Sequence, residues 1–176
     1  GLKAVQMFDA IADGRIKALW VMGTNPAVSL PRADHVREAM RRLELLVVSD
    51  NVASNDSVNL AHVRLPAAAW GEKDGTVTNS ERRISRQRAL FPPPGEARPD
   101  WRIIADVGTA MGHGDAFGWR SPAQVFREYA RLTAYENDGR EDGGRFLHLG
   151  PLAGVTPDAY DALEPVQWPV GEAGGQ

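Results

Sequence analysis

The fold is decided by residues 18–50, ALWVMGTNPAVSLPRADHVREAMRRLELLVVSD. The stretch begins with a short apolar run at 18–22 and closes with a second apolar run at 45–48. Short continuous runs of strand-forming residues are typical of strands buried on both faces of a parallel sheet. Between the two runs, apolar residues recur at helical spacing over 31–43, with proline in the favoured first turn. The stretch therefore predicts a strand, a helix and a second strand parallel to the first.

The same alternation continues on both sides of this stretch. Residues 2–13 carry apolar side chains at helical spacing and stop at a glycine, which predicts a first helix. Residues 56–61 are expected to form a short helix capped by Asn55 or Asp56, and residues 62–65 a third strand closed by a proline. Strands that alternate with helices predict an α/β fold of three layers, a mostly parallel sheet with flanking helices and a Rossmann-like, dinucleotide-binding topology.

The second half of the chain is less regular. Residues 76–78 and 84–88 are expected to pair as a β-ribbon, whose basic run ERRISRQR at 81–88 is typical of a solvated strand edge. The pattern then predicts a helix capped by Asp100, a helix capped by Ser121 with proline at its first position, one or two helical turns at 157–163, and a linker from Val166 to Gln176.

Composition narrows the classes of function. The 176 residues carry a net charge of -3, which argues against a dedicated nucleic-acid binder, and no cysteine, which excludes thiolate chemistry within this chain. The four histidines share no metal-ligand spacing. No apolar run approaches the ~20 residues that span a bilayer, and the N-terminus begins in an amphipathic pattern without the features of a signal peptide. We therefore expect a cytoplasmic chain, cut from a longer one, without nucleic-acid or membrane partners.

Polar side chains follow each of the three expected strands. Thr24 and Asn25 come after the first strand, Ser49 and Asp50 after the second, and Lys73 a few residues after the third. Ligands of parallel α/β sheets bind in the crevice outside the carboxyl ends of the strands. Each residue alone is explained by helix capping, but the set together favours a binding site at this edge.

Lys73 lies in the glycine-bracketed stretch GEKDG at 71–75. Glycines let a ligand approach the main chain closely, and a lysine ammonium then acts as a point charge that suits a phosphate or a carbonyl oxygen. A solvated surface loop explains the same residues equally well, so this stretch by itself leaves both interpretations open.

Three longer stretches carry a resemblance to a known family: residues 18–31, residues 45–101, which include WGEKDGTVTNSERR, and the closing LEPVQWPV at 163–170. In these stretches the chain resembles the molybdopterin-dependent oxidoreductases, which include bacterial nitrate reductases and formate dehydrogenases. The run ERRISRQRALFPPPGEARPDW at 81–101 looks most like the catalytic subunit of assimilatory nitrate reductases.

The resemblance implies a domain organisation and a set of cofactor contacts. Residues 1–135 would form the α/β domain that binds one molybdopterin guanine dinucleotide, and residues 136–176 a loop-rich extension and linker. No catalytic or metal-binding residue is implied within the chain. The implied cofactor contacts are Asn25, Ser49, Asp50, Lys73 and Asp100.

The chemistry of these side chains suits the parts of a nucleotide. One carboxylate can accept the adjacent N–H donors of a guanine edge, and a second suits ribose hydroxyls. We expect Asp50 on the ribose, Asp100 on the guanine, and Lys73 on a phosphate or a base oxygen. The sequence leaves open which carboxylate takes which part.

The resemblance also implies how such a domain is used. The full-length enzyme would reduce nitrate to nitrite at molybdenum, in nitrate assimilation, with an iron-sulfur cluster elsewhere in the enzyme and an electron donor protein or domain. This chain would supply binding and orientation, together with the remaining domains of the same enzyme, and would not be active alone. The alternatives are the same domain of a formate dehydrogenase, or a free-standing nucleotide-binding module, although GxGxxG for NAD is absent after the first strand.

Overall fold

The computed structural model describes residues 1–137 and 145–170. The chain divides into two compact units, Gly1–Ala69 with Pro93–Ile103, and Trp70–Pro92 with Ile104–Gln176. Each unit is therefore built from segments that are separate in sequence. This division does not follow the boundary expected at residue 135, and a cofactor-binding domain over residues 1–135 stays a prediction.

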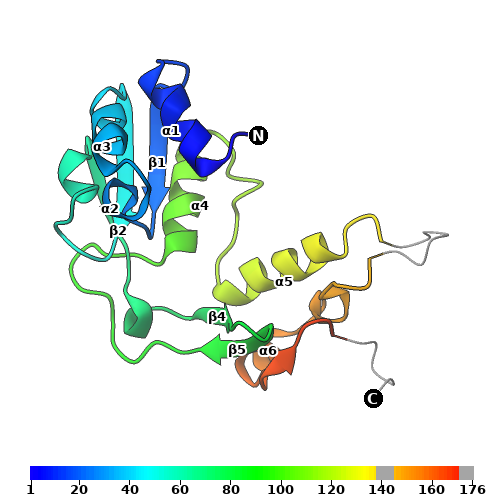
Figure 1. The fold of residues 1–176 in the computed structure, drawn as a ribbon. Coiled ribbons are helices and arrows are strands. Elements are labelled where there is room, and N and C mark those ends of the chain that lie inside the picture. The colour runs from blue at the N-terminus through cyan, green and yellow to red at the C-terminus, as the bar shows by residue number, and fades with distance from the viewer. Residues whose placement is uncertain (138–144, 171–176) are drawn as a thin grey trace. The chain divides into compact units, whose positions relative to one another are not determined.

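The first unit is a parallel sheet with flanking helices, as predicted (Figure 1). The strands lie in the order β1, β2, β3, and both neighbouring pairs are parallel. The predicted helix over 31–43 begins only at Ala33, because Arg32 before it takes a left-handed conformation with φ of 57°. The elements of this unit are α1 (Ala4–Ala12), β1 (Ala18–Met22), α2 (Pro26–Ser29), α3 (Ala33–Arg41), β2 (Leu45–Asp50), the 3-10 turn η1 (Val58–Leu60), β3 (Val63–Pro66) and the start of α4 (Asp100–Ala110).

An apolar core lies between α1, α3 and one face of the sheet. Ile11 of α1, Met40 of α3, and Leu46 and Val48 of β2 are each at most 1% exposed. Leu46 and Val48 are two residues apart, so they project from the same face of β2. Leu45, on the opposite face, is 44% exposed, so the expected burial of β2 on both faces is wrong at its first residue.

The second unit holds an antiparallel sheet in the order β4, β5, β6 and its own apolar core. The predicted β-ribbon and the predicted helix after Ser121 are confirmed, and the Ser121 hydroxyl accepts a hydrogen bond from the Gln124 amide at 3.4 Å. The elements are the 3-10 turn η2 (Trp70–Glu72), β4 (Gly75–Thr78), β5 (Arg83–Gln87), α5 (Pro122–Thr133), the 3-10 turn η3 (Gly150–Leu152), α6 (Pro157–Asp161) and β6 (Val166–Gln167), with α4 entering from the first unit.

Two expectations for this unit are wrong. Val166 and Gln167 do not begin a linker but form β6, because Val166 pairs with Ile84 of β5 and packs against the core. The basic run at 81–88 is not a solvated edge either. Because β5 is the central strand, Ile84 is 1% exposed and the Arg86 side chain 3%. The expected polar loop and the end of the expected linker fall largely outside the described residues.

An ion pair joins α1 to the loop before α3 and gives a pH prediction. Arg32 donates to Asp9 at 2.8 Å, and this hydrogen bond holds the pKa of Asp9 below its ordinary value. A carboxylate with a lowered folded-state pKa stabilises the fold above its unfolded-state pKa, and that contribution is lost as the pH falls through the folded-state value. Urea unfolding followed from about pH 5 to about pH 2 should therefore show a loss of stability that Asp9→Asn reduces. An identical acid-side decline in Asp9→Asn would contradict this.

Candidate functional site

The carboxyl ends of the three parallel strands form one edge of the first unit. The register pairs Asp50 at the end of β2 with Pro66 at the end of β3. The Gly23 amide donates to the Ser49 carbonyl at 3.1 Å, so β1 ends at the same level. Asn25 follows Gly23 in the turn that leads into α2. The structure therefore brings three of the five predicted residues, Asn25, Ser49 and Asp50, to one edge of the sheet.

A polar network joins Asn25 to Asp50 through the turn before η1. The Ser57 hydroxyl donates to Asn25 Oδ1 at 2.6 Å, and the Ser57 amide donates to the same oxygen at 3.2 Å. In the same turn, Asn55 Nδ2 donates to Asp50 Oδ2 at 2.9 Å. Asn55 also accepts from the Val58 amide at 2.8 Å, but the N-cap of η1 is Ser57, so the predicted N-cap at Asn55 or Asp56 is wrong by one or two residues. Ser57 was missed, because its partner lies far away in the sequence.

Asp50 is held in one orientation by its neighbours. Besides Asn55, the amides of Asn51 and Val52 donate to Asp50 Oδ1 at 2.7 and 3.4 Å. An ionised carboxylate offers about four acceptor positions, and the side chain is only half-buried. Asp50 can therefore keep these contacts and still accept a hydroxyl or an N–H from a ligand.

Ser49 has a structural partner in this unit. It is fully buried, and its hydroxyl accepts a hydrogen bond from Trp20 Nε1 at 2.8 Å. A buried indole N–H usually requires such an acceptor, so this contact accounts for a serine at the end of β2. A direct contact between Ser49 and a cofactor stays a prediction.

The segment that leads into α4 lies at the same edge of the sheet. Ala67, the residue after β3, forms a parallel bridge with Arg98, and the Ala68 amide donates to the Arg98 carbonyl at 2.9 Å. This pairing extends the sheet edge beyond β3 and places Asp100 close behind it. Asp100 is the first residue of α4 rather than its N-cap, because the Pro99 carbonyl accepts from two amides of the first turn at 2.9 and 3.1 Å.

Lys73 lies in the second unit, between η2 and β4, and is half-buried. The glycine before it has a packing reason, because a Cβ at Gly71 would stand 2.7 Å from the Phe91 ring. At Gly75 an added Cβ would meet nothing within 4 Å. Convergence of Lys73 with the residues of the first unit stays a prediction.

Residues 1–137 and 145–170 contain neither a metal-binding cluster nor a membrane-spanning helix. No group of three or more histidine, aspartate or glutamate side chains is placed there to hold a metal ion. Within the same ranges, every helix is too short or too polar to cross a bilayer. The edge at the carboxyl ends of the parallel strands in the first unit is therefore the candidate functional site.

The chain is similar to known proteins over most of its length. A family model described as molybdopterin oxidoreductase matches residues 1–110. A nitrate reductase of Klebsiella oxytoca is 57% identical over 97% of this chain. The alpha subunit of an F420-dependent formate dehydrogenase of Methanocaldococcus jannaschii is 43% identical over 76% of this chain. The chain spans only 19% and 20% of these two proteins.

A solved structure shares the fold. Acetylene hydratase from Pelobacter acetylenicus superimposes with a TM-score of 0.66 at 18% identity, over 93% of this chain and 20% of that protein. At this identity the likeness concerns the fold alone. The family match covers the carboxyl ends of all three parallel strands and all of α4. The chain therefore belongs to the molybdopterin oxidoreductase family.

Proposed function

We propose that this chain is part of a molybdenum-dependent nitrate reductase and holds the nucleotide end of one molybdopterin guanine dinucleotide. The observation that carries the proposal is the shared edge of the parallel sheet. Asn25 and Asp50 are tied together there by one turn, and the Ala67–Arg98 bridge supports Asp100, two residues after Arg98, as a further contact at the β3 side of this edge. Nucleotides of parallel α/β folds bind at such an edge.

The donor and acceptor groups at this edge fit a guanine nucleotide. Asp50 and Asp100 are carboxylates, which accept hydrogen bonds from ribose hydroxyls and from the adjacent N–H groups of a guanine edge. Asn25 uses its Oδ1 on Ser57, which leaves its amide Nδ2 to donate to a ligand oxygen. The approach is open at Gly23, where an added Cβ would meet nothing within 4 Å.

The residues of this chain bind and orient, and they carry out no redox step themselves. When bound, the cofactor supplies two-electron chemistry at its molybdenum, with electrons from an iron-sulfur cluster and a donor elsewhere in the complete enzyme. Asp50 on the ribose, Asp100 on the guanine and Lys73 on a phosphate or base oxygen would fix the distal end of the cofactor. Ser49 would contribute by holding the end of β2 in place.

Formate dehydrogenase is the second candidate, because a formate dehydrogenase subunit is 43% identical. Nitrate reduction is favoured by the extent of the matches. The nitrate reductase relative matches 97% of this chain, including the second unit, whereas the formate dehydrogenase relative matches 76%. A free-standing nucleotide-binding module is disfavoured, because these relatives are about five times as long as the chain.

The proposal is tested by identifying what the purified full-length protein carries. We expect acid hydrolysis to release a guanine nucleotide in proportion to the molybdenum content, and the protein to reduce nitrate with an artificial electron donor. Release of an adenine nucleotide, or of pterin without any nucleotide, would overturn the assignment of the cofactor. Formate oxidation without nitrate reduction would select the second candidate instead.

A further inference from the structure

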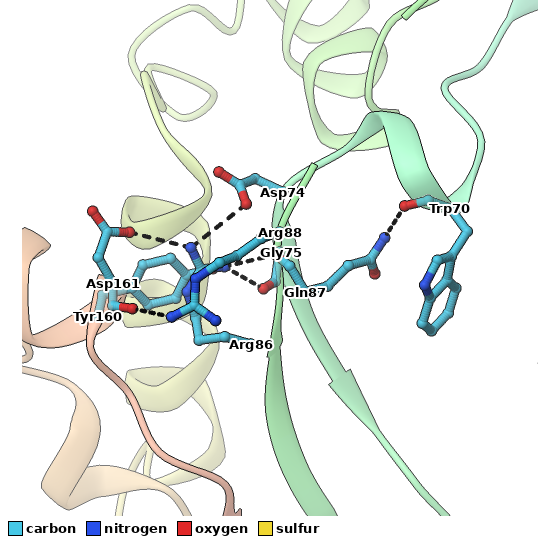
Figure 2. Close-up of polar contacts among 8 residues, drawn as sticks. All are labelled: Trp70, Asp74, Gly75, Arg86, Gln87, Arg88, Tyr160 and Asp161. Atoms are coloured by element: carbon cyan, nitrogen blue, oxygen red, sulfur yellow. Dashed lines mark hydrogen bonds and ion pairs between the residues drawn. The ribbon is translucent and has the colours of Figure 1, made fainter. Parts of the chain in front are cut away.

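Side chains of β5 hold both ends of the turn that carries Lys73, residues 70–75. Gln87 Nε2 donates to the Trp70 carbonyl at 2.5 Å, at the beginning of the turn. Arg86 Nη1 donates to the Gly75 carbonyl at 2.5 Å, at its end. Figure 2 shows these two neighbours on β5 reaching the two ends of the turn. The backbone of residues 70–75 is therefore held from β5.

Arg86 also reaches the C-terminal part of the second unit. Its Nη2 lies 3.1 Å from Asp161 Oδ1 and 3.6 Å from Asp74 Oδ1, and its guanidinium stacks 4.2 Å from the centre of the Tyr160 ring. Figure 2 shows the guanidinium between Asp74 and Gly75 of the turn on one side and α6 on the other. The planar guanidinium holds five donors in a fixed geometry and stacks on an aromatic ring, whereas an ammonium is a compact point charge with three donors on one atom.

Burial of the Arg86 guanidinium is unfavourable for the free energy of folding. The Arg86 side chain is 3% exposed, and its Nε has no hydrogen-bond partner among the described residues. Burying a charge with an unsatisfied donor is unfavourable, and an apolar side chain of similar volume often gives equal or greater stability. The arginine is therefore better explained by the geometry that it imposes than by stability.

The partners of Arg86 are one aromatic ring and two carboxylates. Burial raises the pKa of the Tyr160 phenol, so the ring beneath the guanidinium is neutral at ordinary pH. Asp74 and Asp161 are its two acidic neighbours and lie on opposite elements, the turn and α6. Arg88, the residue directly after β5, donates to the Asp161 carbonyl at 2.5 Å and so fixes α6 as well.

We infer that Arg86 is a positioning residue for the turn at residues 70–75, which it fixes in place by joining Asp74 and Gly75 to Tyr160 and Asp161. The consequence for cofactor binding rests on the proposed function, in which Lys73 of this turn contacts the nucleotide. On this inference α6 belongs to the structure that presents Lys73, although it lies more than eighty residues later in the chain.

The test is hydrogen exchange by mass spectrometry on the purified full-length protein. In Arg86→Lys, which keeps the charge but loses the fork, amides of residues 71–75 should exchange about tenfold faster or more. Asp161→Asn, at a side chain that is 72% exposed, should produce a smaller increase at the same amides without any risk to folding. Amides of α5 should keep their exchange rates in both variants.

Arg83→Lys is the matched control. Arg83 lies on the same strand and pairs with Glu81 at 3.0 Å, and its side chain is 41% exposed. Arg83→Lys should leave the exchange rates of the amides of residues 71–75 unchanged. Unchanged exchange of the turn in both Arg86→Lys and Asp161→Asn would overturn the inference. So would faster exchange over the whole second unit in both variants, because that indicates a general role in stability.

Cofactor content separates this inference from the proposed function. If Arg86 positions the turn and Lys73 contacts the nucleotide, Arg86→Lys should accelerate exchange of the turn and also lower the guanine nucleotide content. Faster exchange with full nucleotide content would uphold the positioning role and count against Lys73 as a cofactor contact. A lower nucleotide content with unchanged exchange would contradict the positioning role and leave the cofactor assignment intact.

Discussion

Full-length protein carrying Asp100→Asn is expected, on the proposed function, to bind the guanine nucleotide cofactor about 10- to 100-fold more weakly than the parent, because one charge-assisted contact is worth about 1.5–3 kcal/mol. An amide cannot accept both N–H groups of a guanine edge as a carboxylate does. The asparagine keeps the size of the side chain at the first position of α4, so folding should change little. The measurement is molybdenum and guanine nucleotide content per protein after extended dialysis.

Asp34→Asn is the matched control for this substitution. Asp34 also lies in the first turn of a helix, α3, but its side chain is fully exposed and pairs with Arg37 of the same helix at 2.8 Å. Its loss should leave the cofactor content unchanged. Equal cofactor content in Asp100→Asn and in the parent would count against Asp100 as a contact, and equal losses in both variants would point to an indirect effect on the fold.

Leu46→Ala is expected to lower the free energy of unfolding by about 2–5 kcal/mol, because it leaves a cavity in a closely packed core. Leu46 is 0% exposed at the centre of the parallel sheet and lies in the cluster with Ile11 and Met40. Since β2 is paired on both sides, the strand cannot easily move to close the cavity. Denaturant unfolding of the 176-residue chain, followed by circular dichroism, measures the change.

Leu45→Ala is the control on the same strand. Leu45 is 44% exposed on the opposite face of β2, so the same change of side chain should cost well under half as much. A comparable loss of stability in both variants would mean that the two faces of β2 are equally buried, contrary to the structure.

The parallel sheet could be predicted because its signal is local. Apolar runs at 18–22 and 45–48, separated by a helical pattern, require only neighbouring residues to be recognised. The edge where Asn25 and Asp50 lie followed from the rule for parallel strands. The hydrogen bond from Ser57 to Asn25 could not be predicted, because the two residues are far apart in the sequence and meet only after the chain has folded.

The structural partners of buried polar groups were harder to predict from the sequence. Ser49 resembles a ligand-binding hydroxyl in sequence, and only the structure shows its bond to Trp20. The basic run at 81–88 was interpreted as a solvated edge because arginine is usually exposed. Arg86 is buried instead, because the Tyr160 ring stacks against its guanidinium and α6 supplies Asp161 as a partner. A strand of two residues such as β6 carries too little pattern to be recognised.

The path of the chain at Trp70 and Pro93 has a consequence for recombinant expression. The polypeptide leaves the first unit after Ala69 and returns to it at Pro93. A truncation at residue 69 would therefore delete Arg98, which pairs with Ala67, and leave the edge of the sheet after β3 unpaired. An unpaired strand edge invites aggregation. Fragments of this protein should therefore be designed to keep residues 93–103 together with residues 1–69, even when only the first unit is wanted.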